Sequence, residues 1–552
     1  MIKKRKQLLR MVALLGVAAL TASSGLAGPA NAVTKEKAKA KAKTKTKPTT
    51  KPKPTVAPTP TAAPAAAASG SVAKFTEIQN GAEPSSWDPT KNRSSAGAEG
   101  NRLYPIFGVL FTMDPKTKAF RPLLADSLTT TDGVNWTMKL HKGVTFTDGT
   151  PFDAAAVKLN WERHKDATNA SASRAFALQL VSVNVVNPLT LTMTLAARNQ
   201  QLVWGMQRSL LNYIASPTAL AAGNFATNPV GAGPFKLKDY KREDRTVFTA
   251  NPAWPFWPGG KPNIEELIIK PVIDENQRFN NIATKQADLV FTQFAQITVK
   301  AKKEGFGTTY TAQEGGNTII FNTTKPPFND QRMRVAMQLA IDFKAFKAVN
   351  SPGDENPITN VFDDDSPFVD KGNNFPKFDL EEAQKNIDAY VRDNGGKQVE
   401  ITLSHFTSTA NALNAAFFQA SWSKLKNVKV TLDPADSAAA QGKVIRGLFS
   451  VSLWGNLWTD PDEIYDALLS TSPQNWGRWG SPVADVALNQ GRNATTVAER
   501  KAAYSNLFKI VNFDVPLIFY DRVPTNWIHD KKTTNFVWFN DGILLIDQLK
   551  FS

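Results

Sequence analysis

The sequence contains no cysteine and only four histidines in 552 residues. Without cysteine there is no disulfide framework, no thiolate nucleophile, no Cys-ligated zinc and no iron–sulfur centre. No two histidines stand three or four residues apart, so they cannot form a helical metal-binding pair; the four are His141, His164, His405 and His529. We therefore expect no metal site and no cofactor. Capture of nickel through a chelator and a single histidine is the less favoured alternative.

The signatures of common catalytic sites are also missing. There is no Gly-x-Ser-x-Gly nucleophile elbow, and the Gly-Ala-Gly run Gly231–Gly233 lacks the lysine of a phosphate-binding loop. The acidic run Asp363–Asp365 lacks the glycine and the twelfth-position glutamate of a calcium loop, which favours a solvated turn. These absences predict that the protein is not an enzyme.

Long apolar runs are scarce. The run Met11 to Leu20 follows the basic stretch Lys3 to Arg10 and precedes the small-x-small triplet Ala30–Ala32. This order is typical of a secretory signal peptide, which we assign to residues 1–32. A retained membrane anchor is the weaker alternative, because the run is about half of the ~20 residues that a spanning helix needs. We expect an exported protein, in the periplasm or on the outer face of the membrane or cell wall. Without cysteine it is not a lipoprotein.

The net charge of +16 is concentrated at the N-terminus. Residues 1–72 hold fourteen Lys and Arg residues and one acid, so they account for +13 and the rest of the chain for +3. A body so close to neutral has no field to hold nucleic acid. Residues 33–72 are rich in Lys, Ala, Thr and Pro, which predicts a disordered linker. Lys35 to Lys53 could bind an anionic cell-wall or membrane surface; a solvated spacer without a partner is the equal alternative.

After the linker, the pattern is that of a mixed α/β protein too long for one core. Alternating apolar residues predict strands over 136–140 and 189–195, and Asp132-Gly133 and Asp148-Gly149 are turn signals. Apolar residues at three- and four-residue steps predict a helix over 332–346, with Asn329 or Asp330 as its cap. No fixed-period repeat is present.

Blocks of sequence then occur in one order along residues 74–552. They are Ala119–Ser127, His141–Phe152, Asn228–Phe235, Asn251-Pro252 with Gly259–Pro262, Phe321–Thr323 with Pro327-Phe328, Ala340–Asp342 and Asp460–Asp462. Together they resemble the peptide/nickel family of ABC-importer solute-binding proteins, known as family 5. The most specific block is His141–Phe152, with its Lys-Gly-Val and Asp-Gly-Thr-Pro-Phe turns.

The resemblance implies a class II periplasmic-binding-protein-like fold with two lobes, an extra subdomain and a hinge. Mapped by the blocks, lobe I comprises residues 74–115, 227–312 and 513–552, the extra subdomain 116–226, and lobe II 313–512. It also implies a monomer that closes over a small-molecule or peptide-like ligand and works with ABC importer permease subunits.

Three segments at the family's cleft positions supply candidate ligand-binding residues. They are Asn80, Trp87 and Tyr104; then Trp454, Gly455, Asn456, Leu457 and Trp458; and then Asn475 and Arg478. Pockets of this kind are mostly apolar or aromatic with a few polar groups. Each residue also has a structural interpretation: a tryptophan in the core, Asp460 as a turn or helix cap, and Arg478 as a solvated loop arginine.

Leu457 departs from the family pattern. Peptide-binding members resemble Trp-x-x-Asp-x-x-Asp/Glu-Pro here, and their first acid pairs with the α-ammonium of the bound peptide. Anchored on Trp454 and Asp460-Pro461, that position is Leu457. A leucine cannot compensate a buried ammonium, and an unpaired one costs several kcal/mol. The site is therefore predicted to suit something other than an ordinary peptide amino terminus.

The leading hypothesis is an extracytoplasmic solute-binding receptor of an ABC importer, which captures a small organic solute, peptide-like or other. The alternative is a wall- or surface-associated scaffolding or adhesion protein that keeps the fold and attaches through its basic tail. An exported hydrolase is disfavoured by the lack of a paired nucleophile and base.

Overall fold

The computed structural model describes residues 70–552 except 82, 94, 96, 115, 312–313, 353–355, 523–524 and 541. The predicted signal peptide and nearly all of the predicted linker, with Lys35 to Lys53, lie outside the described residues. The chain divides into Met1–Ala68 and Ser69–Ser552, and the fold below is that of the second unit. Within the described part, no helix is both long and apolar enough to span a bilayer.

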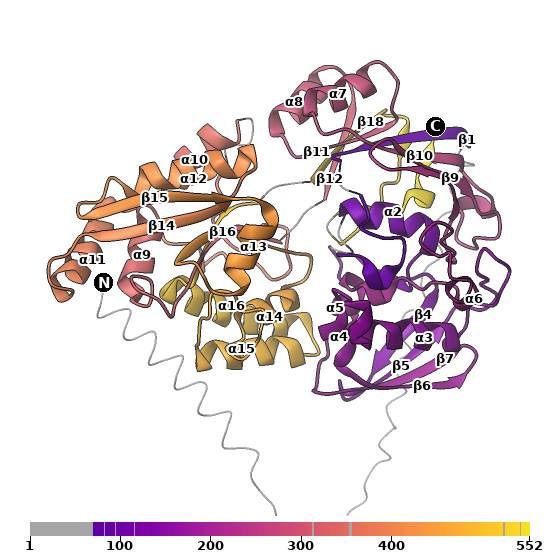
Figure 1. The fold of residues 1–552 in the computed structure, drawn as a ribbon, viewed down its shortest axis with the longest axis horizontal. Helices are drawn as coiled ribbons and strands as arrows, with labels where there is room; N and C mark the ends of the chain where they lie inside the picture. Colours follow the sequence, from indigo (N-terminus) through magenta and orange to yellow (C-terminus); the bar gives the residue numbers. More distant parts are fainter. Residues whose placement is uncertain are drawn as a thin grey trace, which may run out of the picture. The chain divides into compact units, whose positions relative to one another are not determined.

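A seven-stranded mixed sheet forms the centre of what we call the first lobe (Figure 1). Its order is β12 (Gly307–Thr311), β18 (Thr525–His529), β11 (Leu289–Thr292), β1 (Val72–Gln79), β10 (Ile264–Pro271), β9 (Arg245–Ala250) and β8 (Phe235–Lys241). Strand β1 runs parallel to both of its neighbours, and the other pairs are antiparallel. The central β1 and β10 carry runs of buried residues, as expected of strands covered on both faces.

The extra subdomain contains a four-stranded antiparallel sheet. Its strand order is β4 (Ala125–Thr130), β5 (Asn135–Leu140), β7 (Thr190–Leu195) and β6 (Leu180–Asn187). The same part of the chain forms the helices α3 (Ala154–Lys165), α4 (Arg174–Leu178), α5 (Leu202–Arg208) and α6 (Pro217–Ala221). Its apolar side chains belong to one continuous core with those of the first lobe. The extra subdomain therefore shares a hydrophobic core with the first lobe and is also continuous with it along the chain.

A five-stranded sheet forms the centre of the second lobe. Its order is β15 (Val428–Ala435), β14 (Val399–Phe406), β16 (Val451–Trp458), β13 (Glu314–Phe321) and β17 (Leu517–Asp521). Strand β14 runs parallel to β15 and β16, and β13 is antiparallel to β16 and β17. Its core is distinct from that of the first lobe and is made of two clusters of buried side chains.

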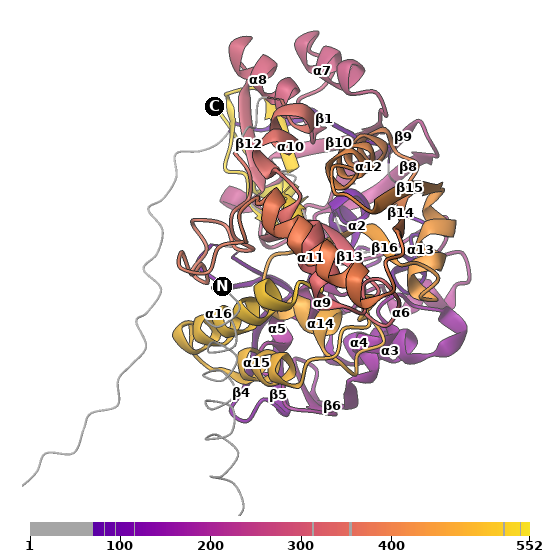
Figure 2. The same cartoon turned by 90° about the vertical axis from the view of Figure 1, so that its left-hand side faces the viewer.

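The remaining elements flank these sheets. In the first lobe they are α2 (Gly97–Phe107), α7 (Glu275–Ala283) and α8 (Ala295–Lys303), with small ribbons β2 (Phe111–Met113) and β3 (Phe120–Pro122), β19 (Thr533–Thr534) and β22 (Lys550–Phe551), and β20 (Trp538–Phe539) and β21 (Ile543–Leu544). In the second lobe they are α9 (Gln331–Leu339), α10 (Phe343–Asn350), α11 (Leu380–Asp393), α12 (Thr409–Trp422), α13 (Ser437–Ile445), α14 (Tyr465–Leu468), α15 (Pro482–Asn493) and α16 (Val497–Asp514). Helices α7 and α8 lie side by side at one end of the first lobe in Figures 1 and 2.

The chain passes between the two sheets twice. It leaves the first sheet after β12 and enters the second at β13, and it leaves the second after β17 and returns to the first at β18. The sequence placed the return at residue 513. In the structure β17 pairs with β13, so the return falls between Asp521 and Thr525. The reason is that Leu517 to Tyr520 are buried in the second lobe's core.

The predicted strands over 136–140 and 189–195 are confirmed as β5 and β7, and the fold class is confirmed as a mixed α/β protein with separate sheets. The single helix predicted over 332–346 is wrong. It is two helices, α9 and α10, because the carboxylate of Asp342 accepts hydrogen bonds from the N–H groups of Lys344 and Ala345 and starts a new helix there. Asp330 caps α9, as expected.

Glu77, on the central strand β1, is a buried carboxyl group with 1% of its surface exposed. Its carboxylate accepts a hydrogen bond from the amide of Gln79, and Arg102 lies near enough to act on it electrostatically. Burial outweighs both and raises the pKa of Glu77 to about 7.

This shift predicts a pH-dependent stability. Because the folded pKa lies above the unfolded one, the stability that the protonated Glu77 contributes is fully present below about pH 4.5 and is lost as the pH rises through about 7. Glu77→Gln mimics the protonated form at every pH. We expect the melting temperature of the variant to match that of the natural protein at pH 4.5 and to exceed it above pH 7.5. A constant difference between the two across this range would contradict the assignment.

Candidate ligand-binding site

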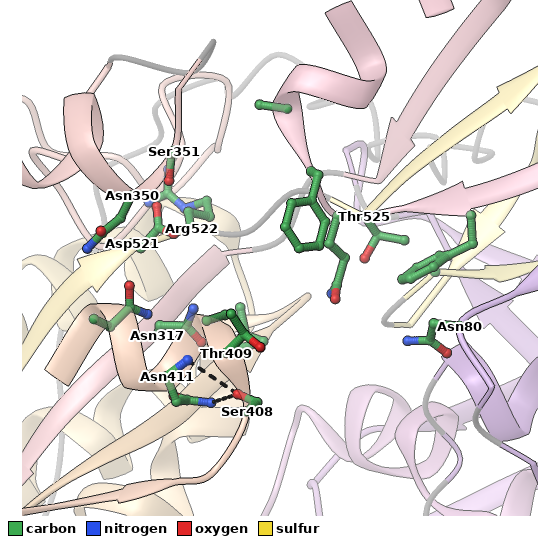
Figure 3. A pocket seen from close by; sticks show the side chains of 18 of the residues that line it. Asn80, Asn317, Asn350, Ser351, Ser408, Thr409, Asn411, Asp521, Arg522 and Thr525 are labelled. Carbon is green, nitrogen blue, oxygen red and sulfur yellow. Dashed lines mark hydrogen bonds between the residues drawn. The ribbon is translucent and has the colours of Figure 1, made fainter. Parts of the chain in front are cut away.

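A cavity of about 620 Å³ is bounded by residues of both lobes. The first lobe contributes the end of β1 at Gln79 and Asn80, the segment from Phe291 to Gln296, and Thr525 and Trp527 of β18. The second lobe contributes Asn317 of β13, the end of α10 with Lys347, Asn350 and Ser351, the start of α12 from Ser408 to Asn414, Leu457 of β16, Asp521 and Arg522. Figure 3 shows Asn80 and Thr525 facing the cavity from one side and Asn317, Thr409 and Asn411 from the other.

The position of the cavity follows from strand direction. The parallel strands β1 and β11 end together at Gln79 and Thr292, so the residues after them gather at one edge of the first sheet. In the second sheet β14 ends at Phe406, and Ser408 then caps α12 by accepting a hydrogen bond from the Asn411 N–H (3.2 Å). In open α/β sheets, ligands bind outside the carboxyl ends of the strands.

Asn317 is placed in the cavity by two glycines that precede it. Gly315 and Gly316 have positive φ values of 74° and 152°. A Cβ on Gly315 would lie 2.1 Å from the carbonyl oxygen of Asn456, and one on Gly316 would lie 2.3 Å from that of Asp521. Only glycine lets β13 enter this closely between β16 and β17. The first side chain after the glycines is Asn317, which lines the cavity.

The charged residues that line the cavity all have protein partners. The ammonium of Lys347 lies 2.7 Å from the carboxylate of Asp521, and their side chains are 2% and 10% exposed. The guanidinium of Arg522 donates to the carbonyl oxygens of Asn360 (2.9 Å) and Val361 (3.0 Å) and lies 3.3 Å from the Asp363 carboxylate. These charges therefore hold the second lobe together at the cavity wall.

A second cavity, of about 500 Å³, lies between the extra subdomain and strand β16. It is lined by residues 172–209 on one side and, on the other, by Trp454, Gly455, Asn456, Leu457 and Trp458, as well as by acidic and basic side chains. Arg208 donates to the carbonyl oxygen of Leu457 (3.0 Å) and pairs with Glu463. Leu457 lines both cavities, so β16 separates them.

The predicted residues are thus only partly brought together. Asn80 and Leu457 line the large cavity, and all five predicted residues of β16 line the second one. Asn475 lines a small adjoining cavity with Trp454 and Asn456, but its amide donates to the carbonyl oxygen of Trp479 (2.7 Å) and holds a turn.

Trp87, Tyr104 and Arg478 lie outside these cavities. Trp87 is a core side chain with its ring edge against Tyr240. Tyr104 is fully buried, and its hydroxyl donates to the Asp547 carboxylate (2.5 Å). The aromatic surface of Trp87 and the hydroxyl of Tyr104 are therefore used within the first lobe, and the ligand contact expected of them stays a prediction. Arg478 is a largely exposed loop residue, which agrees with its structural interpretation.

Several cavity residues were missed from the sequence. They are Gln293, Phe294, Asn317, Asn350 and the segment from Ser408 to Asn414. A usable signal existed for two of these places: the Gly315-Gly316 pair before Asn317, and the Ser408 cap directly after a strand. The others follow strands or helices without any local pattern.

Among the described residues, no group of three or more His, Asp or Glu side chains could hold a metal ion. His164 is buried against Ser171, and burial lowers its pKa to about 4. His141 lies 2.7 Å from the Asp126 carboxylate, outside the large cavity. The residues that line the large cavity are mainly amides, hydroxyls and apolar side chains.

A cavity between two α/β lobes, reached by strand ends from both and lined by such groups, defines a solute-binding protein. The model of the bacterial extracellular solute-binding proteins, family 5, matches residues 119–476. The chain belongs to this family, and its function is that of the solute-binding component of an ABC importer.

Known relatives agree with this assignment. The glutathione-binding protein GsiB of Pectobacterium atrosepticum is 26% identical over 489 residues, covering 86% of this chain and 93% of that protein. The fold is shared with a dipeptide-binding protein of Pseudoalteromonas sp. SM9913 in complex with Met-Leu, at 20% identity and a TM-score of 0.71, covering 87% of this chain and 100% of that one. It is also shared with AgaA of A. tumefaciens R10 in complex with agropinic acid, at 22% identity and a TM-score of 0.72, covering 87% and 99%.

Asp460 anchors the segment that follows Leu457. Its carboxylate accepts a hydrogen bond from the Asp462 N–H (3.0 Å) and caps the short helix η5 (Pro461–Ile464), as the sequence indicated. It also forms an ion pair with Arg500, and both side chains are at most 5% exposed.

We expect Asp460→Ala to lower the free energy of unfolding by roughly 3–5 kcal/mol, because it leaves the Arg500 guanidinium buried without a partner. The matched control is Glu400→Ala. It breaks the ion pair of Glu400 with Lys429, in which the two side chains are 72% and 57% exposed. The substitution should lower the free energy of unfolding by less than about 1 kcal/mol. Denaturant unfolding measures both, and equal losses would contradict the structural role of Asp460.

Proposed function

We propose that this protein is an exported receptor that captures one small organic solute between its two lobes and delivers it to the permease subunits of an ABC importer. The observation that carries the proposal is the cavity of about 620 Å³ bounded by residues of both lobes. Its volume falls in the range of sites that enclose small molecules. No chemical change of the solute is part of the proposal.

Closure of the lobes would occur about the two passages between the sheets. One passage lies between Thr311 and Glu314, and the other between Asp521 and Thr525. With the return moved to the second of these, we propose residues 74–115, 227–312 and the segment from 525 onward as the first lobe, 116–226 as the extra subdomain, and 313–522 as the second lobe. A closed, liganded form is what a permease can distinguish from the empty one.

The proposal also covers the cellular location and the oligomeric state of the protein. A signal peptide in residues 1–32 would direct export, and the lack of cysteine excludes attachment through a lipid-modified thioether. Lys35 to Lys53 would keep the body near an anionic surface or act as a spacer. We propose a monomer, since one chain supplies both sides of the cavity. The scaffolding alternative is not favoured, because a full cavity is preserved.

The proposal predicts a bound solute. Full-length protein purified without denaturant should release a small organic molecule on unfolding, which mass spectrometry can identify. Adding the molecule back at about 100 times its Kd should stabilise the fold by ~2.7 kcal/mol, seen as a rise in melting temperature. Folded protein that releases nothing, and whose melting temperature no member of a small-solute library changes, would favour scaffolding instead.

The Leu457 position predicts a second result. Because no acid stands there, trialanine with a free amino terminus should bind weakly, and Leu457→Asp should tighten its binding by about tenfold or more, while N-acetyl-trialanine gains nothing. Leu413→Asp is the matched control, since Leu413 also lines the cavity, from α12, and should not reproduce the gain. Isothermal titration calorimetry measures the Kd of each peptide for each variant. Tight trialanine binding by the natural protein would refute the prediction.

A further inference from the structure

The lining of the large cavity is neutral and rich in amides. Of the described residues that line it, nine are Asn or Gln and four are Ser or Thr, whereas three are charged. Neutral hydrogen-bonding groups therefore dominate, and they come from both lobes. Gln293 and Gln296 lie on the first lobe, and Asn317, Asn350 and Asn414 on the second.

The three charged residues do not offer a free charge to a ligand. Lys347 and Asp521 form a buried ion pair with each other, and Arg522 is bonded to the Asp363 carboxylate and to two carbonyl oxygens. A peptide with free termini carries an ammonium and a carboxylate that both need partners when water is excluded. At this cavity wall, a free ammonium would gain a carboxylate partner only by competing with Lys347 for Asp521. A free carboxylate would compete with Asp363 for Arg522, whose Nε alone has no hydrogen-bond partner among the described residues.

Several of the amides are available to a ligand, among them Gln293 and Asn317. The side chains of Gln293 and Asn317 make no hydrogen bond with any other described residue. An amide carries two N–H donors and a carbonyl acceptor side by side. A neighbouring pair of hydroxyl groups also offers a donor and an acceptor side by side, so the two match in both directions. These amides reach the cavity from opposite lobes and can bind one solute from both sides.

The cavity also has apolar surface at its rim. Phe294 of the first lobe is 44% exposed and Leu413 of the second is 56% exposed, and both line the cavity. An aromatic side chain provides a rigid flat surface at a low cost in conformational entropy. A ring with hydroxyl groups around its edge and C–H groups on its faces can use such a surface and the amides at the same time.

We propose that the cavity binds an uncharged, hydroxyl-rich ring solute, chemically a short oligosaccharide, in preference to a zwitterionic peptide. This inference rests on the proposed receptor function and specifies the class of its ligand. Gln293 and Asn317 bind hydroxyl pairs, and Phe294 packs on a sugar face. Leu457, where an acid would be needed for an ammonium, contributes apolar contact.

The test measures the binding of the full-length protein to two panels by isothermal calorimetry. One panel contains uncharged di- to tetrasaccharides: cello-, malto-, xylo-, manno- and chito-oligosaccharides. The other contains dialanine, trialanine and tetraalanine with free termini. We expect at least one saccharide to bind with a Kd at least tenfold lower than that of any peptide.

Variants then locate the binding. Gln293→Ala, Asn317→Ala and Phe294→Ala should each raise the Kd of the bound saccharide by about tenfold. The matched controls are Asn184→Ala, an exposed amide on β6, and Phe378→Ala, whose side chain is 44% exposed like that of Phe294. Both lie outside the cavity and should leave the Kd unchanged.

Four results would overturn the inference. A peptide that binds more tightly than every saccharide would reject the ligand class and leave the receptor function in place. A saccharide whose Kd is unaffected by the three cavity variants would reject this cavity as its site. Binding of neither panel, together with a charged solute released from the purified protein, would also reject the class. Binding of neither panel with no released solute would reject the receptor function as well.

Discussion

Strand β18 stands between β11 and β12 in the first sheet, although it follows the entire second lobe in sequence. Strand β18 forms hydrogen bonds with both neighbours, so the first sheet includes a strand that lies after the whole second lobe in the sequence. Two passages of chain must then run between the lobes, and both begin or end at strands that border the large cavity. The position of the binding site is therefore a consequence of this strand order, since Asp521 and Arg522 stand before the passage and Thr525 after it.

The buried charges serve the scaffold and leave the cavity neutral. Asp460 with Arg500, and Lys347 with Asp521, are ion pairs in which each partner compensates the other at low exposure. Removing one partner of such a pair is costly, because the remaining charge stays buried. Asp460 is thus a helix cap and an ion-pair partner that stabilises the fold. The position at which the family resemblance implies an acid for a peptide ammonium is Leu457, and that interpretation stays a prediction.

Local patterns in the sequence were sufficient for the strands β5 and β7, for the caps at Asp330 and Asp460, and for the family blocks. They failed where a local cap interrupts an apolar pattern, and where a contact distant in sequence decides. The apolar periodicity over 332–346 continues across Asp342, but the side chain of Asp342 bonds to the next N–H groups and divides the helix. Trp87 and Tyr104 stand near the expected cleft in sequence, yet Tyr240 and Asp547, far along the chain, draw them into the core. Gln293 follows β11 without a local pattern, and its place in the lining of the large cavity is evident only from the structure.

Contacts made by amides, hydroxyls and an aromatic ring depend less on the ionic strength of the solution than contacts between charged groups do. Ionic screening acts on separated charges. Of the charged residues that line the large cavity, Lys347 and Asp521 pair with each other and Arg522 pairs with Asp363. Amide side chains do not titrate, so the contacts that they would make with a solute carry no charge that depends on pH. A cavity lined mainly by amides and hydroxyls therefore depends less on ionic strength than one whose wall presents free charges.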